Sequence, residues 1–427
     1  MKKYEEYSRE ELENELELVK ARYTEFSLRD LSLNMARGIP SPKQMDLSAA
    51  MFKMVKADED YHNETGIDCR NYGGLDGLPE LKELFATMMN VEPSQVIVGG
   101  NSSLNMMFDT VAQFMTHGSY EGGTPWMLQK DNKFLCPVPG YDRHFKITEY
   151  FGIKMINIPL NEDGPDMDEV RKWVKDPTVK GMWCVPKYSN PSGIVYSDKI
   201  IDEIAQLKPA SKDFRILWDN AYCVHHLTDD EIYIPNLLEE CEKYGNEDMV
   251  IKFASTSKIT FPGAGVAAQA ASARNVAFLK KRMSFQTIGP DKLNQLRHAR
   301  FFRNIDDIMA HMRKHAEILR PKFETILSRF NKELLGLGIA RWTEPKGGYF
   351  ISLNVMNGCA KRVVELCREA GVILTGAGAP YPYGFDPDDS NIRIAPSFPS
   401  VTELDAASEL LSISIKYAAL EKILEEK

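Results

Sequence analysis

A lysine follows an apolar run near the middle of the chain, in the tetrapeptide Ser255-Thr256-Ser257-Lys258. Lysine is seldom buried without a partner, so a lysine at the end of a buried strand is unusual. One interpretation is a Schiff-base lysine, whose ammonium group must be desolvated or balanced before it can react as a nucleophile. The other is that Lys258 simply begins an exposed loop. The tetrapeptide alone is compatible with both.

An acidic residue ends a second apolar run, Ile216-Leu217-Trp218-Asp219, and Tyr222 follows three residues later. Open α/β sheets bind ligands at the carboxyl ends of their strands, which is where Asp219 is expected. Pyridoxal chemistry needs such an acid, because a protonated pyridine nitrogen lets the ring accept electrons. Asp219 could equally be the N-cap of a helix.

Two further turns follow predicted strands. In Tyr188-Ser189-Asn190-Pro191-Ser192-Gly193, the amide of Asn190 could donate to a phenolate oxygen, although Asn-Pro loops are commonly plain turns. In Gly99-Gly100-Asn101-Ser102-Ser103, small and hydroxyl residues lead into a helix, an arrangement that suits a phosphate group. Ser and Asn also cap helices without any ligand, so this motif is weak by itself.

The elements that must position these residues alternate between short apolar runs and helical stretches from about residue 46 to 290. Several runs are apolar at consecutive positions, as expected for strands buried on both faces. This alternation predicts an α/β layer with a mostly parallel sheet. The seven predicted strands are 95–100, 133–138, 153–160, 181–186, 214–220, 249–255 and 265–271.

The flanking segments differ in character. Ser8 and Glu11 have capping-box spacing ahead of a predicted helix over 9–26, and the Gly/Pro-rich segment 36–42 follows it. Asp306–Phe330 reads as one long helix with a kink at Pro321. Strand-like segments and a closing helix complete a smaller α+β domain; they cover 340–355, 371–375, 391–397 and 401–425. We therefore expect an N-terminal segment that packs with the small domain, a large domain and a small domain, at residues 1–45, 46–305 and 306–427.

Composition excludes several classes of protein. The 427 residues are 43% hydrophobic and 26% charged, with a net charge of −9 and no basic block, which disfavours broad nucleic-acid binding. We expect no membrane-spanning segment and no secretory signal. The seven scattered cysteines, without a CxxC pair, predict buried thiols in a reducing cytoplasm.

Six short motifs, in this order, resemble those of the fold type I pyridoxal-phosphate aminotransferases, the class I/II aspartate aminotransferase superfamily. The resemblance covers about residues 30–400. The segments ARGIPSP, PVPGYDRHF and SKITFPGAGVA are similar to those of a bacterial aspartate aminotransferase subgroup. That subgroup is itself similar to the catalytic half of certain regulators. It implies a large domain with a mostly parallel seven-stranded sheet between helices, and a smaller α+β domain. The motifs are Asn71-Tyr72-Gly73-Gly74-Leu75-Asp76-Gly77, Gly100-Asn101-Ser102, Asn190-Pro191-Ser192-Gly193, Asp219 with Tyr222, Ser255-x-Ser257-Lys258 and Asn391-Ile392-Arg393.

The resemblance implies pyridoxal 5′-phosphate as cofactor and assigns residues to it. Lys258 would be the Schiff-base lysine and proton carrier, and Asp219 would pair with the pyridine nitrogen. Tyr222 and Asn190 would bind the phenolate oxygen, and Tyr141 would stack on the ring. The phosphate would be held by Gly100, Asn101, Ser102, Ser103, Ser255 and Ser257, and by Tyr72 of a neighbouring subunit in a homodimer with shared sites.

The resemblance also implies a substrate site. Arg393 and Asn190 would bind the substrate α-carboxylate, the arginine through a planar fork. Gly38 lies in a stretch that folds over the substrate in this family, and Arg37 either reads the distal carboxylate or pairs with a nearby acid. The chain departs from the family at Gly265, where a phosphate-binding arginine is usual, and at Asn101, where some members carry a lysine for the distal carboxylate.

The function expected is transfer of the amino group of an acidic amino acid, aspartate first, to a 2-oxo acid such as 2-oxoglutarate by a ping-pong mechanism. A lyase or decarboxylase of the same fold, a ligand-sensing regulator and a non-catalytic homologue are the alternatives. The regulator needs a winged helix, and about 35 residues before the first motif cannot supply one. We expect no metal site: His311 and His315, spaced i, i+4 on a charged helix, are predicted to face solvent.

Overall fold

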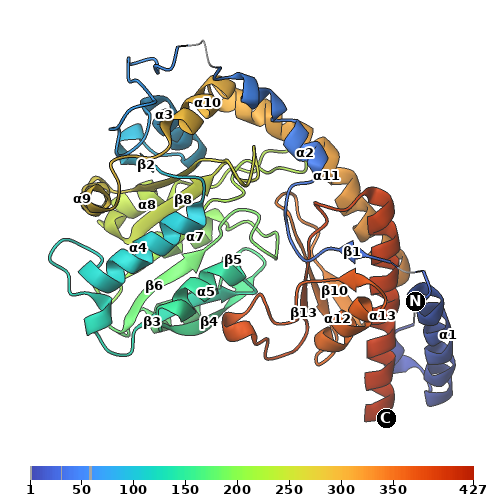
Figure 1. Cartoon of the computed structure of the whole chain (residues 1–427). Helices are drawn as coiled ribbons and strands as arrows, with labels where there is room; N and C mark the ends of the chain where they lie inside the picture. The colour runs from blue at the N-terminus through green and yellow to red at the C-terminus, as the bar shows by residue number, and fades with distance from the viewer. Residues whose placement is uncertain (1, 30, 57–59) are drawn as a thin grey trace.

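The computed structural model describes residues 2–29, 31–56 and 60–427. Its largest feature is an eight-stranded sheet in the order β2-β9-β8-β7-β6-β3-β4-β5 (Figure 1). Neighbours from β8 to β4 pair in parallel, whereas β9 is antiparallel to β8 and β2, and β5 is antiparallel to β4. The strands are β2 Val96–Val98, β3 Lys133–Val138, β4 Lys154–Asn161, β5 Gly164–Pro165, β6 Val179–Cys184, β7 Arg215–Asp219, β8 Val250–Ser255 and β9 Ala267–Ala271.

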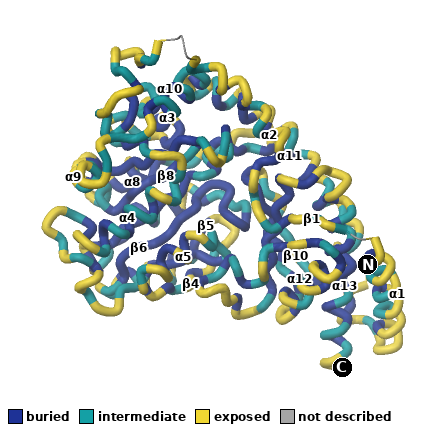
Figure 2. The backbone as a smooth tube through the Cα atoms, in the orientation of Figure 1, coloured by how far each residue is buried: buried dark blue, intermediate teal, exposed yellow. Residues whose placement is uncertain are grey.

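The sheet is buried on both faces. On β7, Leu217 packs in one apolar cluster with Phe114 of α4, whereas its neighbour Trp218 packs in another with Ile204 of α7. Figure 2 shows β6 and β8 as buried backbone, with exposed residues on the outer helices and loops. The predicted α/β sheet of seven strands is confirmed, with the two-residue β5 added at its edge. The helices of this part are α3 Pro79–Met89, α4 Ser103–His117, α5 Asp142–Tyr150, α6 Met167–Trp173, α7 Asp198–Ala205, α8 Leu237–Glu242, α9 Ala273–Gln286 and α10 Lys292–Phe301.

The second part is built around a three-stranded antiparallel sheet in the order β10-β11-β13. The long helix α11 reaches it from the large sheet, and α1 lies along α13 beside both chain ends (Figure 1). The predicted capping box of α1 is present, because Ser8 Oγ accepts from Glu11 N and Glu11 Oε2 accepts from Ser8 N. The elements are α1 Arg9–Ser27, α11 Ile305–Glu333, β10 Ala340–Trp342, β11 Ile351–Val355, α12 Ala360–Glu369, β13 Asn391–Ile394 and α13 Val401–Glu426.

The segment that joins α1 to the large sheet crosses between these parts. Its strand β1, Leu33–Asn34, pairs in parallel with β12, Val372–Ile373, which was predicted as a longer strand over 371–375. The short helix α2, Pro42–Asp46, then packs on α11. Residues 35–41 are thus held at both ends between the two parts of the molecule.

The prediction that His311 and His315 face solvent is wrong. Their side chains are buried, because they lie on the side of α11 that packs against Ser48 and the carbonyl of Ile259. The charged neighbours Arg313 and Lys314 remain exposed. Helical spacing placed both histidines on one face, but the face that α11 buries depends on segments distant in sequence.

Candidate active site

Lys258 and Asp219 are brought together at the carboxyl edge of the large sheet. Asp219 ends β7, and Lys258 lies three residues beyond the end of the parallel neighbour β8. The Lys258 ammonium lies 5.0 Å from the centre of the Tyr222 ring. Burial lowers the pKa of Lys258 because it disfavours the charged form, while the negative charge of Asp219 acts in the opposite direction. The environment favours a reactive lysine over one in an open loop.

Asp219 is held by a histidine that sequence reasoning missed. His144 Nε2, on α5, lies 3.0 Å from Asp219 Oδ2, and the other carboxylate oxygen accepts from Ala221 N at 3.1 Å. The His144 ring stacks on Trp183, with centroids 4.3 Å apart and planes 8° apart. Asp219 therefore has a fixed orientation, and it organises a turn rather than the N-cap of a helix.

Tyr141 stands beside this pair. It precedes α5, and its ring meets the His144 ring edge-on at 4.9 Å. Burial and the negative charge of Asp219 raise the pKa of Tyr141 to about 12, so the phenol stays protonated at neutral pH. Tyr222 is also buried, and its pKa is raised well above the usual value for the same main reason. The two phenols and Lys258 surround Asp219.

The residues predicted to form a phosphate cradle lie where β2 passes into α4. Ser102 is the N-cap of α4, and its Oγ accepts from Asn105 N at 3.4 Å. Ser257 Oγ donates to Asn101 O at 3.3 Å, which joins the cradle to the lysine loop, and Ser255 Oγ donates to Ser257 Oγ at 3.2 Å. A helix N-terminus with free N–H groups and nearby hydroxyls attracts an anion.

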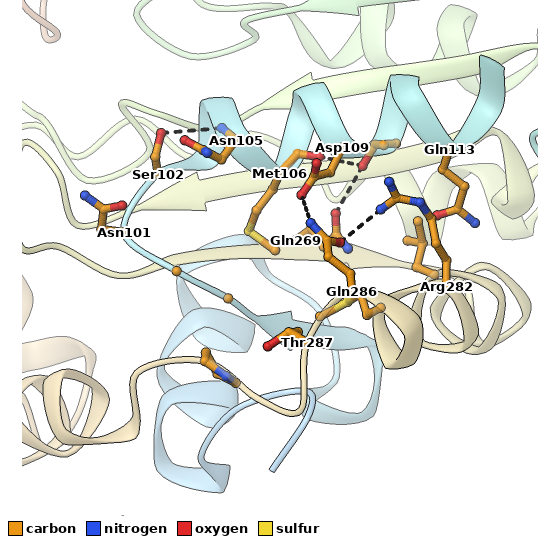
Figure 3. A pocket seen from close by; sticks show the side chains of 16 residues that line it. Asn101, Ser102, Asn105, Met106, Asp109, Gln113, Gln269, Arg282, Gln286 and Thr287 are labelled. Atoms are coloured by element: carbon orange, nitrogen blue, oxygen red, sulfur yellow. Dashed lines mark hydrogen bonds between the residues drawn. The ribbon is translucent and has the colours of Figure 1, made fainter. Parts of the chain in front are cut away.

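Figure 3 shows Asn101 and Ser102 at the start of α4, beside a cavity of about 380 Å³. The cavity continues along α4 and α9, where Gln286 donates to Asp109 at 2.8 Å and accepts from Arg282 at 3.0 Å. Its lining includes neither Lys258 nor Asp219. The cavity therefore adjoins the cradle without containing the lysine.

Gly265, where the family usually has an arginine, is closely packed. A Cβ atom there would lie 3.0 Å from Thr256 Oγ1 and 3.1 Å from Phe261 O. The side chain of Asn294 covers this bend by donating to Gly265 O at 2.9 Å. A side chain at position 265 would displace these neighbours, which gives a physical reason for the departure.

Arg393 is buried on β13 and has two hydrogen-bond partners near the large sheet, at the start of α5 and in the loop after β6. One of its terminal nitrogens donates to Asp142 Oδ1 at 2.7 Å and to Asn190 Oδ1 at 3.4 Å. Its Nε atom has no hydrogen-bond partner, and its guanidinium lies 5.1 Å from the centre of the Phe350 ring. Arg393 and Asn190 are therefore neighbours, as predicted. Asp142 as a further partner was not predicted.

The N-terminal segment reaches the same place through Gly38. A side chain at Gly38 would collide with the Phe350 ring, so the backbone can pass there only as glycine. Arg37 is exposed, and no hydrogen bond or ion pair involves its side chain in the described part of the chain. Tyr72 is 81% exposed on a separate loop, and no described contact joins it to Lys258 or to the cradle.

These groups suit pyridoxal 5′-phosphate. The site offers a half-buried lysine with a lowered pKa, an oriented acid on the neighbouring strand, a helix N-terminus for a phosphate, and an arginine whose buried Nε atom has no partner. Residues 7–427 match the sequence model of the family described as aspartate amino-transferase. The chain belongs to this family. It is accordingly an aminotransferase that uses pyridoxal 5′-phosphate and acts on amino and 2-oxo acids.

Individual relatives agree with this assignment. An aspartate aminotransferase of Corynebacterium glutamicum is 44% identical over 403 residues, covering 94% of this chain and 93% of the relative. The crystal structure of an aspartate transaminase from the same species superposes with a TM-score of 0.96 at 42% identity, covering 98% of each chain. The α-aminoadipate aminotransferase LysN of Thermus thermophilus, crystallised with N-(5′-phosphopyridoxyl)-L-leucine, shares the fold, with a TM-score of 0.74 at 19% identity and coverage of 93% and 95%.

Membrane-spanning helices and metal-binding clusters are both absent from the described residues. Among the described residues, no helix has the length and apolar character needed to cross a membrane. No group of three or more metal-ligating side chains comes together in that part of the chain either.

Proposed function

We propose that this aminotransferase takes the amino group of aspartate and passes it to 2-oxoglutarate in a ping-pong reaction. The observation that carries the proposal is the half-buried Lys258, with its lowered pKa, beside the oriented Asp219, with Arg393 and Asn190 adjacent. The choice of aspartate is supported by the Corynebacterium glutamicum relative, which is named aspartate aminotransferase.

The cofactor, when bound, supplies an aldehyde carbon for the amino group and a ring that accepts electrons from the substrate α-carbon. Asp219, oriented by His144, would keep the pyridine nitrogen protonated. Tyr222 and Asn190 would bind the phenolate oxygen, and Tyr141 would lie against the ring. The phosphate would rest at the start of α4 and on the serines of the lysine loop, namely Gly100, Asn101, Ser102, Ser103, Ser255 and Ser257.

Lys258 would carry out the proton transfer. Its Nζ atom would first bind the cofactor and, once displaced by the substrate amino group, would take the proton from the substrate α-carbon. A lowered pKa suits both tasks, because a neutral amine is the nucleophile and the base. Among the described residues, Lys258 is the lysine whose ammonium lies over the Tyr222 ring and whose pKa responds to the charge of Asp219.

Substrate recognition would divide between two arginines. Arg393 would bind the α-carboxylate, because its partnerless Nε atom and second terminal nitrogen leave a fork for a carboxylate. Arg37, which the backbone at Gly38 brings toward Phe350, would read the distal carboxylate of aspartate. The aspartate side chain is therefore expected to bind on the N-terminal side of the site.

We further propose a homodimer with shared sites. Tyr72 lines a surface hollow together with Ile288, and both side chains are largely exposed in the single chain. Phe285, close by in sequence, is 86% exposed. Exposed apolar side chains gathered in this way are typical of a protein interface. Tyr72 would then reach the cofactor phosphate of the neighbouring subunit.

The thiols support a cytoplasmic location, which we also propose. All seven cysteines are described, and all seven are free. Free and mostly buried thiols are typical of reducing compartments. Cell fractionation with an antibody against the enzyme would test this location.

The decisive experiment incubates the purified enzyme with aspartate and 2-oxoglutarate and measures oxaloacetate and glutamate. Equal amounts of both products are expected, with parallel lines in a double-reciprocal plot. Consumption of aspartate that does not depend on a 2-oxo acid would instead indicate a lyase or decarboxylase. Borohydride treatment followed by peptide mapping should place the reduced cofactor on Lys258, and another lysine in that position would overturn the assignment.

A further inference from the structure

A chain of buried polar side chains joins the N-terminal segment to the backbone of Lys258. Gln44 of α2 lies between Tyr349 and His315, with its Nε2 atom 2.9 Å from Tyr349 Oη and 3.2 Å from His315 Nδ1. Each of these three residues is at most 1% exposed. Tyr349 Oη lies in turn 3.4 Å from Lys258 O. None of these contacts involves a substrate- or cofactor-binding side chain.

The amide of Gln44 has a defined orientation. Ser41 N donates to Gln44 Oε1 at 3.0 Å, and Ser41 Oγ lies 3.2 Å from the same oxygen. Because a backbone N–H can only donate, the amide oxygen faces Ser41 and the NH₂ group faces the other two residues. Both N–H groups of Gln44 are therefore donated, one to Tyr349 Oη and one to His315 Nδ1.

This orientation fixes the protons of the next residues. Tyr349 Oη accepts from Gln44, so its own hydrogen is available for Lys258 O. His315 Nδ1 also accepts, so a neutral His315 must carry its proton on Nε2, which lies 3.2 Å from His311 Nε2. His311 Nε2 lies in turn 3.0 Å from Ile259 O. The two branches thus end at successive residues, with Tyr349 Oη at the carbonyl of Lys258 and His311 Nε2 beside that of Ile259.

We propose that Gln44, Tyr349 and His315 are positioning residues that hold the Lys258 backbone, and so aim its amine. The inference rests on the proposed role of Lys258. A lysine side chain carries four rotatable bonds, so a fixed backbone at its root narrows the region that the amine can reach. The hydrogen bond from Tyr349 Oη to Lys258 O restricts rotation of the peptide group that follows the lysine. The chain also links Lys258 to α2, six residues after Gly38.

Loss of any link should misplace the amine without removing it. We expect Gln44→Leu and His315→Leu to lower kcat about tenfold or more while KM changes less than about threefold, because displacing a catalytic group impairs chemistry more than binding. The visible absorbance of the bound cofactor reports the protonation of its bond to Lys258. Its pH midpoint should shift in both variants. His315→Gln, whose amide oxygen can still accept from Gln44, should restore much of kcat.

A change of donor direction at Gln44 provides a sharper comparison. Gln44→Glu keeps an oxygen toward Ser41 but offers no N–H to Tyr349, whose hydroxyl must then turn to the new carboxylate and leave Lys258 O. The side chain is nearly isosteric, so packing should be preserved. The pH midpoint should still shift, because Lys258 O has lost its donor. Tyr349→Phe should shift the midpoint in the same direction, because it also removes the donor to Lys258 O.

The matched control is Met312→Ala. Met312 is buried on α11, and its side chain makes no hydrogen bond with Gln44, Tyr349 or His315. It should lower the unfolding temperature without moving the midpoint. The proposal is overturned if the polar variants behave like Met312→Ala, with lower stability and an unchanged midpoint and kcat. A failure of the proposed function is distinguishable, because the unaltered enzyme would then show no borohydride-reducible bond at Lys258. If the leucine variants do not fold, Gln44→Glu and Tyr349→Phe decide the question.

Discussion

The Arg393 guanidinium donates to the Asp142 carboxylate at 2.7 Å, across the boundary between the small and large sheets. Asp142 therefore occupies one nitrogen of the arginine that we assign to the substrate α-carboxylate. A substrate carboxylate must either displace Asp142 or use the remaining nitrogens of the guanidinium. By either route, the Asp142 carboxylate lies close to the bound substrate.

Asp142→Asn should tighten substrate binding. The amide removes a charge that repels the substrate α-carboxylate and competes with it for Arg393. Because the Arg393–Asp142 ion pair is partly solvated, the effect should be modest, and we expect KM for aspartate and alanine to fall about two- to fivefold. Steady-state kinetics with both donors would measure this. A rise in KM would mean instead that Asp142 orients Arg393 for binding.

Arg37→Ala should impair aspartate far more than alanine. If Arg37 pairs with the distal carboxylate, its loss should cost about 2–5 kcal/mol in kcat/KM for aspartate, since it leaves the distal carboxylate of the bound substrate without its partner. Alanine has no distal carboxylate and should change little. The quantity to measure is the aspartate-to-alanine ratio of kcat/KM. An unchanged ratio would remove Arg37 from the substrate site.

His144→Phe should weaken cofactor binding and turnover together. Phenylalanine keeps the stacking on Trp183 but removes the 3.0 Å contact with Asp219, so the carboxylate loses its fixed orientation. We expect a loss of about ten- to a hundredfold in kcat, and faster cofactor release on dialysis. His298→Phe, at another buried histidine of the large domain, is the control for packing damage.

Lys258→Ala should abolish turnover in a folded protein. The residue is both the tether and the proton carrier in our proposal, so no measurable exchange of the aspartate α-hydrogen with solvent is expected. Circular dichroism and gel filtration would verify the fold. Substantial residual exchange would assign the base to another group.

Acid should destabilise the protein from about pH 6.5 downward. Burial lowers the pKa of His298 to about 4 and that of His315 to about 3, so the folded state binds fewer protons than the unfolded state below pH 6.5. The free energy of unfolding should therefore fall as pH falls, by about 2 kcal/mol for each histidine between pH 6.5 and 5. Urea titrations at these pH values would measure the loss. His298→Gln should make the slope shallower, and an unchanged slope would contradict the assignment.

Local patterns were sufficient for the strands of the large sheet. Runs such as Phe134–Val138 are apolar at consecutive positions, and only a strand covered on both faces explains them. Turn residues likewise located the start of α4 at Ser102 and Ser103, because the capping chemistry of a helix N-terminus is visible in a few adjacent residues.

Contacts between distant segments were not predictable in this way. His144 and Asp219 are 75 residues apart in the sequence, and Arg393 and Asp142 are 251 residues apart. The local pattern around one member of each pair therefore does not indicate which distant residue will be its partner. The same limit explains the error at His311 and His315. Their spacing identified a shared face, but whether that face meets water depends on Ser48 and Ile259, which the chain brings back from elsewhere.

The pairing of α1 with α13 imposes an order on the folding steps that accompany synthesis at the ribosome. Leu12, Val19 and Phe26 of α1 are buried in the cluster that α13 completes, and α13 is translated almost 400 residues later. Until then α1 has no partner for its apolar stripe, and β1 likewise has no partner until β12 is translated. The large sheet can close first, as sequential domain folding allows. The segment bearing Arg37 and Gln44 can therefore reach its final place only after α11 and β12 have emerged, so a chain stalled before β12 would already contain Lys258 and yet be inactive.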